Sequence, residues 1–200
     1  MPADLSPVSL EPLTPAERRD LLLLARTSIR CALDLDVLLP EITLTLALLE
    51  PTAAFVSLHI EGRLRGCVGS VTPDNPLHET VAHMARSAAL DDPRFPALTP
   101  DEVAFIDVEI SRLSRMMAAR PDDVRPGIHG VCISSGTHRA VFLPQVATTY
   151  GWDRDTLLDE LCLKAFLPAR AWRQAECEIL VFVAEVFGEI REARMVNDCE

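Results

Sequence analysis

The stretch AFVSLHIEGRLRGCVGSV, residues 54–71, decides the fold class of this chain. Its first part, Ala54 to Ile60, is rich in β-forming residues, and a second extended part, Arg63 to Val71, follows it. The two residues between them, Glu61-Gly62, fit the two-residue turn that joins neighbouring antiparallel strands. The stretch therefore predicts a β-hairpin.

A helix is predicted on the N-terminal side of the hairpin. Thr14 can accept a hydrogen bond from the Glu17 amide, and the Glu17 side chain can accept one from the Thr14 amide. Apolar residues three and four positions apart continue this helix to about Leu33. Residues 1–13 contain three prolines and predict a flexible lead-in. Residues 42–49 are apolar at nearly every position and fit either a strand or a helix.

A second helix and a third strand are predicted after the hairpin. Asn75-Pro76 opens the helix, which ends before the proline of Asp91-Asp92-Pro93. Thr99-Pro100-Asp101-Glu102 is a second capping sequence. In residues 105–112, which follow it, mostly polar side chains alternate with mostly apolar ones. This period of two is typical of a strand with one face in water.

The last third of the chain predicts a second hairpin, another helix and a final strand. Short strands at 131–134 and 139–143 flank a turn. Asp153 caps a helix that Pro168 ends, and residues 177–187 form one long strand. The apolar face of that helix consists of Leu157, Leu158, Leu161, Ala165 and Phe166.

Together these elements predict an α+β fold with a largely antiparallel sheet and flanking helices. The reason is that hairpins are joined by helices while no strand–helix–strand crossover recurs. The fold is expected to occupy residues 14–188, between the lead-in and an acidic tail at 189–200.

Composition excludes several classes of function. Net charge is −11, from 30 acidic against 19 basic residues, so we expect no binding to nucleic acid. No apolar run approaches the roughly 20 residues of a membrane helix. The first 13 residues lack the basic start and apolar core of a signal peptide. A cytoplasmic protein without membrane contact is therefore expected.

The cysteines point to reduced thiols rather than to a metal site. None of them forms the CxxC pair that structural zinc sites need. The six positions are 31, 67, 132, 162, 177 and 199. We expect no disulfide and no bound metal. No phosphate-binding loop, dinucleotide fingerprint or G-x-S-x-G elbow occurs, so no cofactor is expected.

The most unusual segment is LRGCVG, residues 64–69. If the strand keeps its pleat, Arg63, Arg65 and Cys67 point to one face. Two guanidiniums beside a thiol would favour the reactive thiolate, and the glycines on either side of Cys67 would let a ligand or another backbone approach. The alternative is that Cys67 packs as a small apolar residue and the glycines mark a bulge.

Two other groups are weaker candidates for chemistry. His129 lies between Ile128 and Gly130 at a strand entrance and is the best-placed acid–base residue for a thiolate; alternatively, it caps a loop carbonyl. Asp91 and Asp92 could form a metal or cation site, but helix termination and arginine pairing are the favoured explanation.

These motifs resemble the AMMECR-type domain family, whose prokaryotic members are called AmmeMemoRadiSam system protein A. Order and spacing agree with that family over about residues 14–188. Besides LRGCVG, the resemblance rests on DPRFP at 92–96, LTPDE at 98–102, GIHG at 127–130, FLPQV at 142–146, GWD at 151–153 and LCLKA at 161–165.

The resemblance implies a large antiparallel sheet with flanking helices plus a smaller lobe, with LRGCVG at a cleft. It also implies a bacterial or archaeal cytosolic protein and a genetic association with a Memo-like protein and a radical-SAM protein. It implies no particular reaction.

Two functions therefore stay open. In the first, the chain is an accessory module that holds an anionic small molecule or a partner protein in a cleft around LRGCVG. In the second, it is a thiol enzyme with Cys67 as nucleophile, His129 as base and Arg65 as anion clamp. The residues expected to contact the ligand or line the rim of the cleft are Arg65, Gly66, Gly69, Asp92, Arg94 and Gln145.

Overall fold

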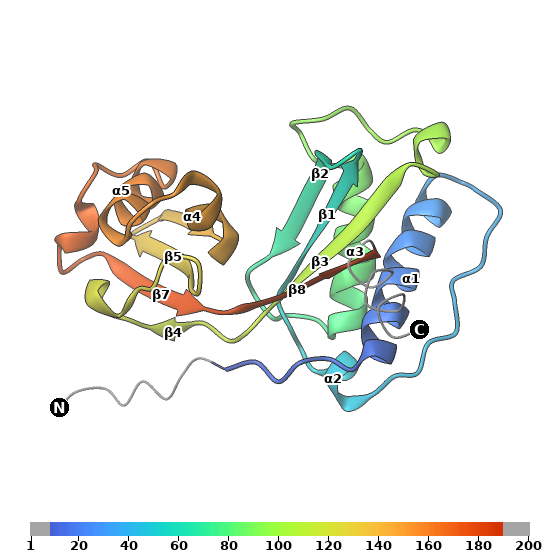
Figure 1. Ribbon diagram of the computed structural model, residues 1–200, viewed down its shortest axis with the longest axis horizontal. Coiled ribbons are helices and arrows are strands. Elements are labelled where there is room, and N and C mark those ends of the chain that lie inside the picture. The colour runs from blue at the N-terminus through green and yellow to red at the C-terminus, as the bar shows by residue number, and fades with distance from the viewer. Residues whose placement is uncertain (1–8, 190–200) are drawn as a thin grey trace. The chain divides into compact units, whose positions relative to one another are not determined.

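The computed structural model describes residues 9–189, and its chain divides into two units (Figure 1). The large unit contains residues 11–113 and 185–189, and the small unit contains residues 114–184 with 9–10. Each unit holds one four-stranded sheet. The chain thus has the expected α+β architecture, with antiparallel hairpins and flanking helices.

The sheet of the large unit has the strand order β2-β1-β3-β8. Its strands are β1 (Ala54–Ile60), β2 (Arg63–Ser70), β3 (Ile106–Leu113) and β8 (Ala184–Gly188). Strand β1 pairs antiparallel with both β2 and β3. Glu61 and Gly62 form the turn between β1 and β2 with positive φ angles of 52° and 76°, as a tight hairpin of matching twist requires. The predicted hairpin is confirmed.

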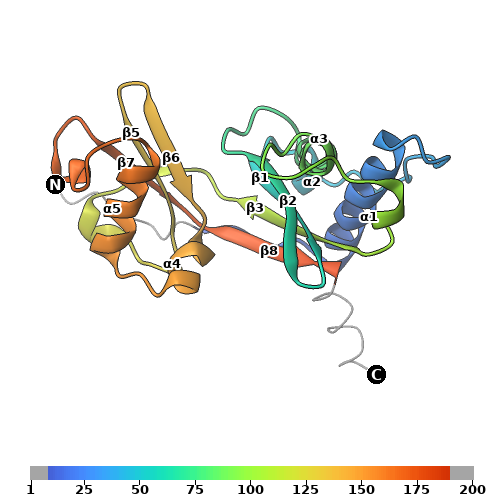
Figure 2. The ribbon, with the colours of Figure 1, turned by 90° about the horizontal axis from the view of Figure 1, so that it is seen from above.

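Two helices cover one face of this sheet (Figure 1 and Figure 2). They are α1 (Pro15–Ala32) and α3 (Leu77–Leu90). One apolar core joins Leu21, Ala25 and Ile29 of α1, Val81, Ala85 and Ala88 of α3, and Val56, Leu58, Val108 and Ile110 of the strands. The other face of the sheet is the one that bears the side chain of Cys67.

Local sequence rules set the helix starts of the large unit. The Thr14 and Glu17 capping box is present at the start of α1, as predicted. A second capping box joins Thr99 to Glu102, where the chain makes only the 3-10 turn Pro100–Glu102. Leu13, assigned to the lead-in by the sequence, is buried in the core, and residues 1–8 lie outside the described residues.

The ambiguous segment 42–49 contains one short helix, α2 (Leu46–Leu49). The Thr45 hydroxyl caps it by accepting a hydrogen bond from the Leu48 amide. Only Leu48 is fully buried, whereas Leu46 is 88% exposed. The continuous apolar run therefore forms neither a buried strand nor a buried helix.

The small unit has the strand order β4-β7-β5-β6. Its strands are β4 (Met117–Ala118), β5 (Gly130–Ser135), β6 (His138–Phe142) and β7 (Glu178–Phe182), and its helices are α4 (Pro144–Tyr150) and α5 (Arg154–Lys164). The short turns Pro121–Asp123 and Ala171–Arg173 are 3-10 helices. The pairing of β5 with β6 is antiparallel, which confirms the second predicted hairpin.

The prediction of one continuous strand over 177–187 is wrong. The segment splits into β7 and β8, which belong to different sheets. At the break, the Val183 amide donates to Ser114 Oγ at 3.0 Å, and the Val183 carbonyl accepts from the Ser114 amide at 2.9 Å. A run of apolar residues predicts extended backbone but does not reveal where the chain passes from one sheet to another.

Helix α5 also ends earlier than predicted. It stops at Lys164, and Phe166 follows with a φ of 58° and a side chain that is 88% exposed. Phe166 is therefore not part of the apolar face, and the left-handed turn ends the helix before Pro168. The predicted cap by Asp153 is present, since its side chain accepts from the Thr156 amide at 2.8 Å.

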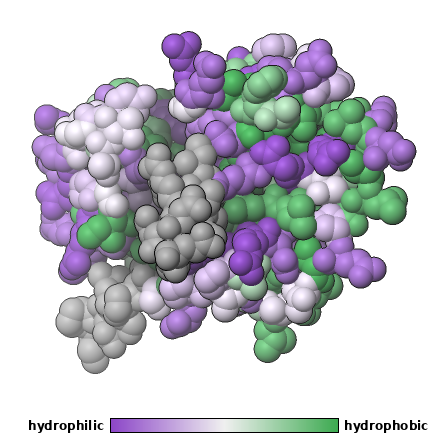
Figure 3. Space-filling view, turned by 45° about the vertical axis from the view of Figure 1, so that its right-hand side comes forward, coloured by the Kyte–Doolittle hydropathy of each residue, from purple (hydrophilic) through white to green (hydrophobic). Residues whose placement is uncertain are grey.

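Hydrophilic and hydrophobic side chains both lie on the surface. Hydrophilic and hydrophobic groups are interspersed on the face seen in Figure 3, as expected because apolar atoms contribute more than half of a typical protein surface. Within residues 9–189, no helix is both long and apolar enough to cross a membrane. The acidic tail, predicted for 189–200, lies outside the described residues from 190 onward.

Gly66 of β2 leads to a stability prediction. A Cβ atom at this position would overlap the backbone carbonyl of Ala88 in α3, and backbone cannot move aside as a flexible side chain can. Gly66→Ala should lower the free energy of unfolding by about 3 kcal/mol, measured by urea denaturation.

The control is Gly62→Ala in the hairpin turn. A Cβ atom at Gly62 meets nothing within 4 Å. This variant therefore measures only the cost of a positive φ, and its free energy of unfolding should fall by about 1 kcal/mol. Equal losses in the two variants would contradict the close packing of β2 on α3.

Candidate functional site

A β-bulge in β2 sets the direction of the side chains around Cys67. Leu64 and Gly66 pair with consecutive residues of β1, which leaves Arg65 as an extra residue between them. The bulge interrupts the alternation of the strand. Arg63 and Cys67 therefore point to opposite faces of the sheet. The predicted shared face is wrong, because it assumed an unbroken pleat.

The glycines beside Cys67 accommodate other parts of the protein. Gly66 lies against the Ala88 carbonyl of α3, and Gly69 lies against the ring of Phe55 in β1. The sequence predicted that a ligand or another backbone segment approaches these glycines. At Gly66 the neighbour is the backbone of α3. That Gly66 and Gly69 bind a ligand stays a prediction.

Both backbone groups of Cys67 are bound by residues that follow α3. The Cys67 amide donates to Asp92 Oδ2 at 2.8 Å, and its carbonyl accepts from Arg94 Nη2 at 3.1 Å. Arg94 also forks onto the Asp92 carboxylate, with Nε to Oδ1 at 2.9 Å and Nη2 to Oδ2 at 2.7 Å. The Arg94 amide also donates to Asp92 Oδ1 at 3.1 Å. Five hydrogen bonds thus join these three residues into one unit, which we call the Cys67 clamp.

The electrostatics of the Cys67 clamp keep it charged. Hydrogen bonds from the Arg94 guanidinium hold the pKa of Asp92 well below its ordinary value of 3.8, with further help from the Cys67 amide. The same pairing raises the pKa of Arg94. The Asp92 side chain is 3% exposed and that of Arg94 is 57% exposed. Asp92 is therefore an ionised anchor at neutral pH and not a proton donor.

The thiol of Cys67 lies in a polar environment. Its side chain is half-buried, and Sγ accepts a hydrogen bond from the hydroxyl of Ser57 at 3.2 Å. Ser57 is the residue of β1 that pairs directly with Cys67. The thiol is therefore only partly covered, and it can present sulfur to a molecule that approaches this face of the sheet.

Arg65 holds a loop in place. Its guanidinium binds both carboxylate oxygens of Glu102, at 2.8 and 3.0 Å. It also donates to the carbonyls of Pro96 and Ala97, at 2.9 and 3.4 Å. These contacts use four of the five N–H groups of an arginine. Arg65 thus holds the segment after Asp92 in place, and its predicted role in binding an anion stays a prediction.

Two predicted site residues belong to the small unit. His129 Nδ1 accepts a hydrogen bond from the Arg125 amide at 3.3 Å. Burial lowers its pKa, and the nearby Arg125 charge adds to the effect, which favours the neutral imidazole. Gln145 is exposed on α4. The approach of either residue to Cys67 stays a prediction.

Sequence reasoning missed two residues of this region. Ser57 could have been found only from the strand register, which the bulge shifts by one position. Glu102 was recognised as part of a capping box, but its pairing with Arg65 joins residues 37 positions apart. No local pattern indicates such a pair.

The described residues hold no cluster of three or more His, Cys, Asp or Glu side chains suited to a metal ion. The five cysteines at positions 31, 67, 132, 162 and 177 are free thiols, and Cys199 lies outside the described residues.

Comparison with known proteins adds the family to this geometry. The model of the AMMECR1 family matches residues 22–187, a span that runs through both units. This chain belongs to the AMMECR1 family. The match contains every predicted site residue, from Arg65 to Gln145.

Several relatives of this AMMECR1 domain come from archaea. A protein of Methanopyrus kandleri is 37% identical over 189 residues, covering 90% of this chain and 91% of its own. A protein of Methanothermobacter thermautotrophicus is 39% identical over 142 residues, covering 68% of this chain and 74% of its own. The crystal structure of an uncharacterised protein from Pyrococcus horikoshii matches with a TM-score of 0.78 and 33% identity, covering 84% of this chain and 89% of the other. Their names state no activity.

The structural role of Arg65 leads to a prediction. Arg65→Ala should lower the free energy of unfolding by about 2 kcal/mol at pH 7, because it removes a partly buried pair and two carbonyl contacts. Arg63→Ala, two residues away and exposed, should change it by less than about 0.5 kcal/mol. Equal losses of unfolding free energy in the two variants would contradict the structural role of Arg65.

The same variants test the pH dependence. Pairing with Arg65 lowers the pKa of Glu102 from 4.5 to about 2. A lowered carboxyl pKa stabilises the fold above pH 4.5, and this stability is lost as the pH falls toward 2. Between pH 5 and pH 2 the wild type should therefore lose more stability than Arg65→Ala, as measured by urea denaturation across that range.

Proposed function

We propose that this AMMECR1 domain is an accessory binding module that receives an anionic group at the Cys67 clamp. The observation that supports it most directly is the state of the Arg94 guanidinium. One edge of it is bonded to Asp92 and to the Cys67 carbonyl, whereas Nη1 makes no hydrogen bond within residues 9–189. This arrangement leaves two N–H donors on an exposed side chain.

The anchored position of Arg94 favours binding. An arginine in solution must be immobilised before it can bind a ligand, and this ordering opposes association. Here Asp92 and the Cys67 carbonyl already hold the guanidinium, which also lies 5.6 Å from the centre of the Phe95 ring. A carboxylate or phosphate can then form charge-assisted hydrogen bonds with Nη1, and the Arg94 side chain loses little further conformational entropy.

The anionic group belongs, in this proposal, to a small molecule or to a partner protein. The family resemblance points to a Memo-like protein and a radical-SAM protein as the partners. The thiol of Cys67 and the hydroxyl of Ser57 lie on the face that such a partner would approach, and they supply polar contacts next to Arg94.

Arg94→Lys tests the module. Lysine keeps a positive charge beside Asp92 but lacks the second, exposed edge of the guanidinium. We expect it to weaken binding of the purified Memo-like or radical-SAM protein from the same organism by about tenfold, measured by titration calorimetry. Arg86→Lys, on the exposed side of α3, should stay within about twofold of wild type.

Two results would contradict the binding of these partner proteins at the Cys67 clamp. One is that neither partner protein binds the wild-type chain. The other is that Arg94→Lys binds as tightly as Arg86→Lys. Cys67→Ser should leave binding nearly unchanged, because the clamp holds the backbone of Cys67 rather than its sulfur.

A thiol enzyme is the second candidate, favoured by the half-buried Cys67 thiol and its bond from the Ser57 hydroxyl. In this alternative Cys67 is the nucleophile and His129 is the base, so the two residues must approach each other. Loss of activity in Cys67→Ser would then follow from loss of the attacking sulfur.

Alkylation of Cys67 distinguishes the two candidates. Under the module, iodoacetamide should modify Cys67 no faster than a free cysteine at pH 7, as measured by peptide mass spectrometry. Cys31, also half-buried in the large unit, is the internal reference. Rapid modification of Cys67 that slows in His129→Ala would instead support the enzyme and overturn the module.

A further inference from the structure

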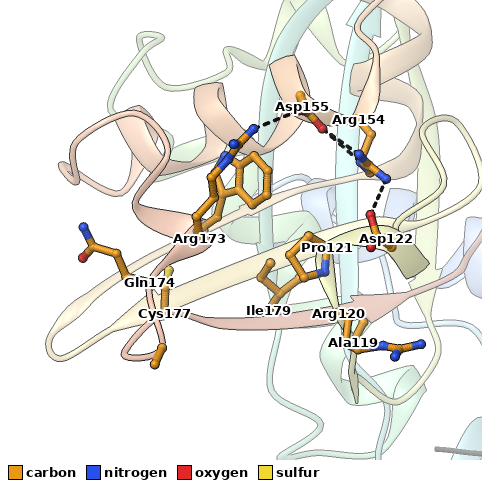
Figure 4. A pocket seen from close by; sticks show the side chains of 12 residues that line it. Ala119, Arg120, Pro121, Asp122, Arg154, Asp155, Arg173, Gln174, Cys177 and Ile179 are labelled. Carbon is orange, nitrogen blue, oxygen red and sulfur yellow. Dashed lines mark hydrogen bonds and ion pairs between the residues drawn. The ribbon is translucent and has the colours of Figure 1, made fainter. Parts of the chain in front are cut away.

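The small unit contains a pocket of about 650 Å³ that none of the predicted site residues lines (Figure 4). Its walls come from the two 3-10 turns Pro121–Asp123 and Ala171–Arg173, the start of α5, and β7. The volume lies within the roughly 300–1,000 Å³ typical of small-molecule sites. The pocket is therefore large enough for a small organic ligand.

The apolar part of the pocket is formed by buried side chains. Ile179 of β7 and Trp172 both line it and are almost fully buried. The Trp172 indole N–H donates to Asp159 at 2.6 Å, which fixes the orientation of the ring. Cys177 and Pro121 complete this apolar wall. A ligand with a hydrocarbon or aromatic body could pack there.

A row of charged side chains runs along the rim (Figure 4). Arg154 Nη1 donates to Asp122 at 2.8 Å, and its Nε donates to Asp155 at 3.0 Å. Arg173 Nη2 donates to the other oxygen of Asp155 at 3.2 Å. Arg154 thus links the two carboxylates, and Arg173 adds a second guanidinium at the end of the row.

Among the arginines that line the pocket, Arg173 has the most unbonded N–H groups in the described part of the chain. Only one of its N–H groups is bonded within the described part of the chain, which leaves four donors. Its guanidinium lies over the Trp172 ring, 4.5 Å from the ring centroid, and its side chain is 53% exposed. Stacking on the indole restricts the guanidinium without occupying its donors. It is ready to receive an anion.

We propose that this pocket binds a small organic carboxylate with an apolar body. The carboxylate would form a bidentate pair with Arg173, and the body would lie against Trp172 and Ile179. A phosphate dianion fits less well, because Asp122 and Asp155 on the same rim would repel its second charge. One negative charge matches Arg173, the lining guanidinium with the fewest N–H groups bonded within the described residues.

This site is independent of the function proposed above. All residues that line the pocket belong to the small unit, whereas the Cys67 clamp belongs to the large unit. Failure of either proposal therefore leaves the other standing.

Benzoate is the probe that tests the carboxylate site. It should shift the Trp172 indole N–H resonance in ¹H–¹⁵N spectra of the full chain, with a dissociation constant on the order of 1 mM. Trp152→Phe assigns the resonance, since the chain has two tryptophans. Arg173→Gln should weaken binding about tenfold.

The matched control is Arg120→Gln. Arg120 lines the same pocket, but its guanidinium is bonded to Asp123 and its side chain is 75% exposed. This variant should stay within about twofold of wild type. Asp122→Asn is a second variant that does not alter Arg173; it should bind benzoate as tightly as wild type or about twofold tighter, because a repelling charge is removed.

Four results would overturn the proposal. They are no shift with about 20 mM benzoate, equal binding of the neutral analogue benzamide, tighter binding of phenyl phosphate than of benzoate, and equal loss in Arg173→Gln and Arg120→Gln. Tighter phenyl phosphate binding would assign the pocket to phosphate esters instead.

Discussion

The buried carboxylate of Asp92 is the group on which the arrangement around Cys67 depends. It accepts hydrogen bonds from the Cys67 amide and from Nε and Nη2 of Arg94, so it joins the strand β2 to the segment after α3. A buried charge is tolerated only when it is paired and hydrogen-bonded, and each of these bonds meets that requirement. Because Asp92 orients Arg94, the exposed donors of that guanidinium are a consequence of the buried pair.

The LRGCVG segment shows how a distinctive sequence can serve the fold and a site together. Arg65 binds Glu102, Gly66 packs closely against the backbone of α3, and Gly69 packs closely against the ring of Phe55. These residues hold the strand, the helix and the following loop in one geometry. The thiol of Cys67 is the part of the segment that this packing leaves half-buried and next to a hydroxyl.

The two proposals assign a different kind of recognition to each unit. In the large unit a sheet face presents a thiol and an anchored guanidinium, which suits a surface contact with an anionic group. In the small unit a walled pocket combines a buried indole with a charged rim, which suits a small molecule. Both use an arginine whose position is set by a neighbour, Asp92 in one case and Trp172 in the other.

The sequence by itself determined the β-hairpins, the helix caps at Thr14 and Asp153, the α+β class and the family, because these depend on residues within a few positions of each other or on motifs in order along the chain. Only the tertiary structure decided the bulge at Arg65, the split of 177–187 between two sheets and the pairing of Arg65 with Glu102. Strand register and buried charge pairs depend on which distant segments pack together. Several registers and pairings satisfy the same local pattern, and the packing of the whole unit selects one of them.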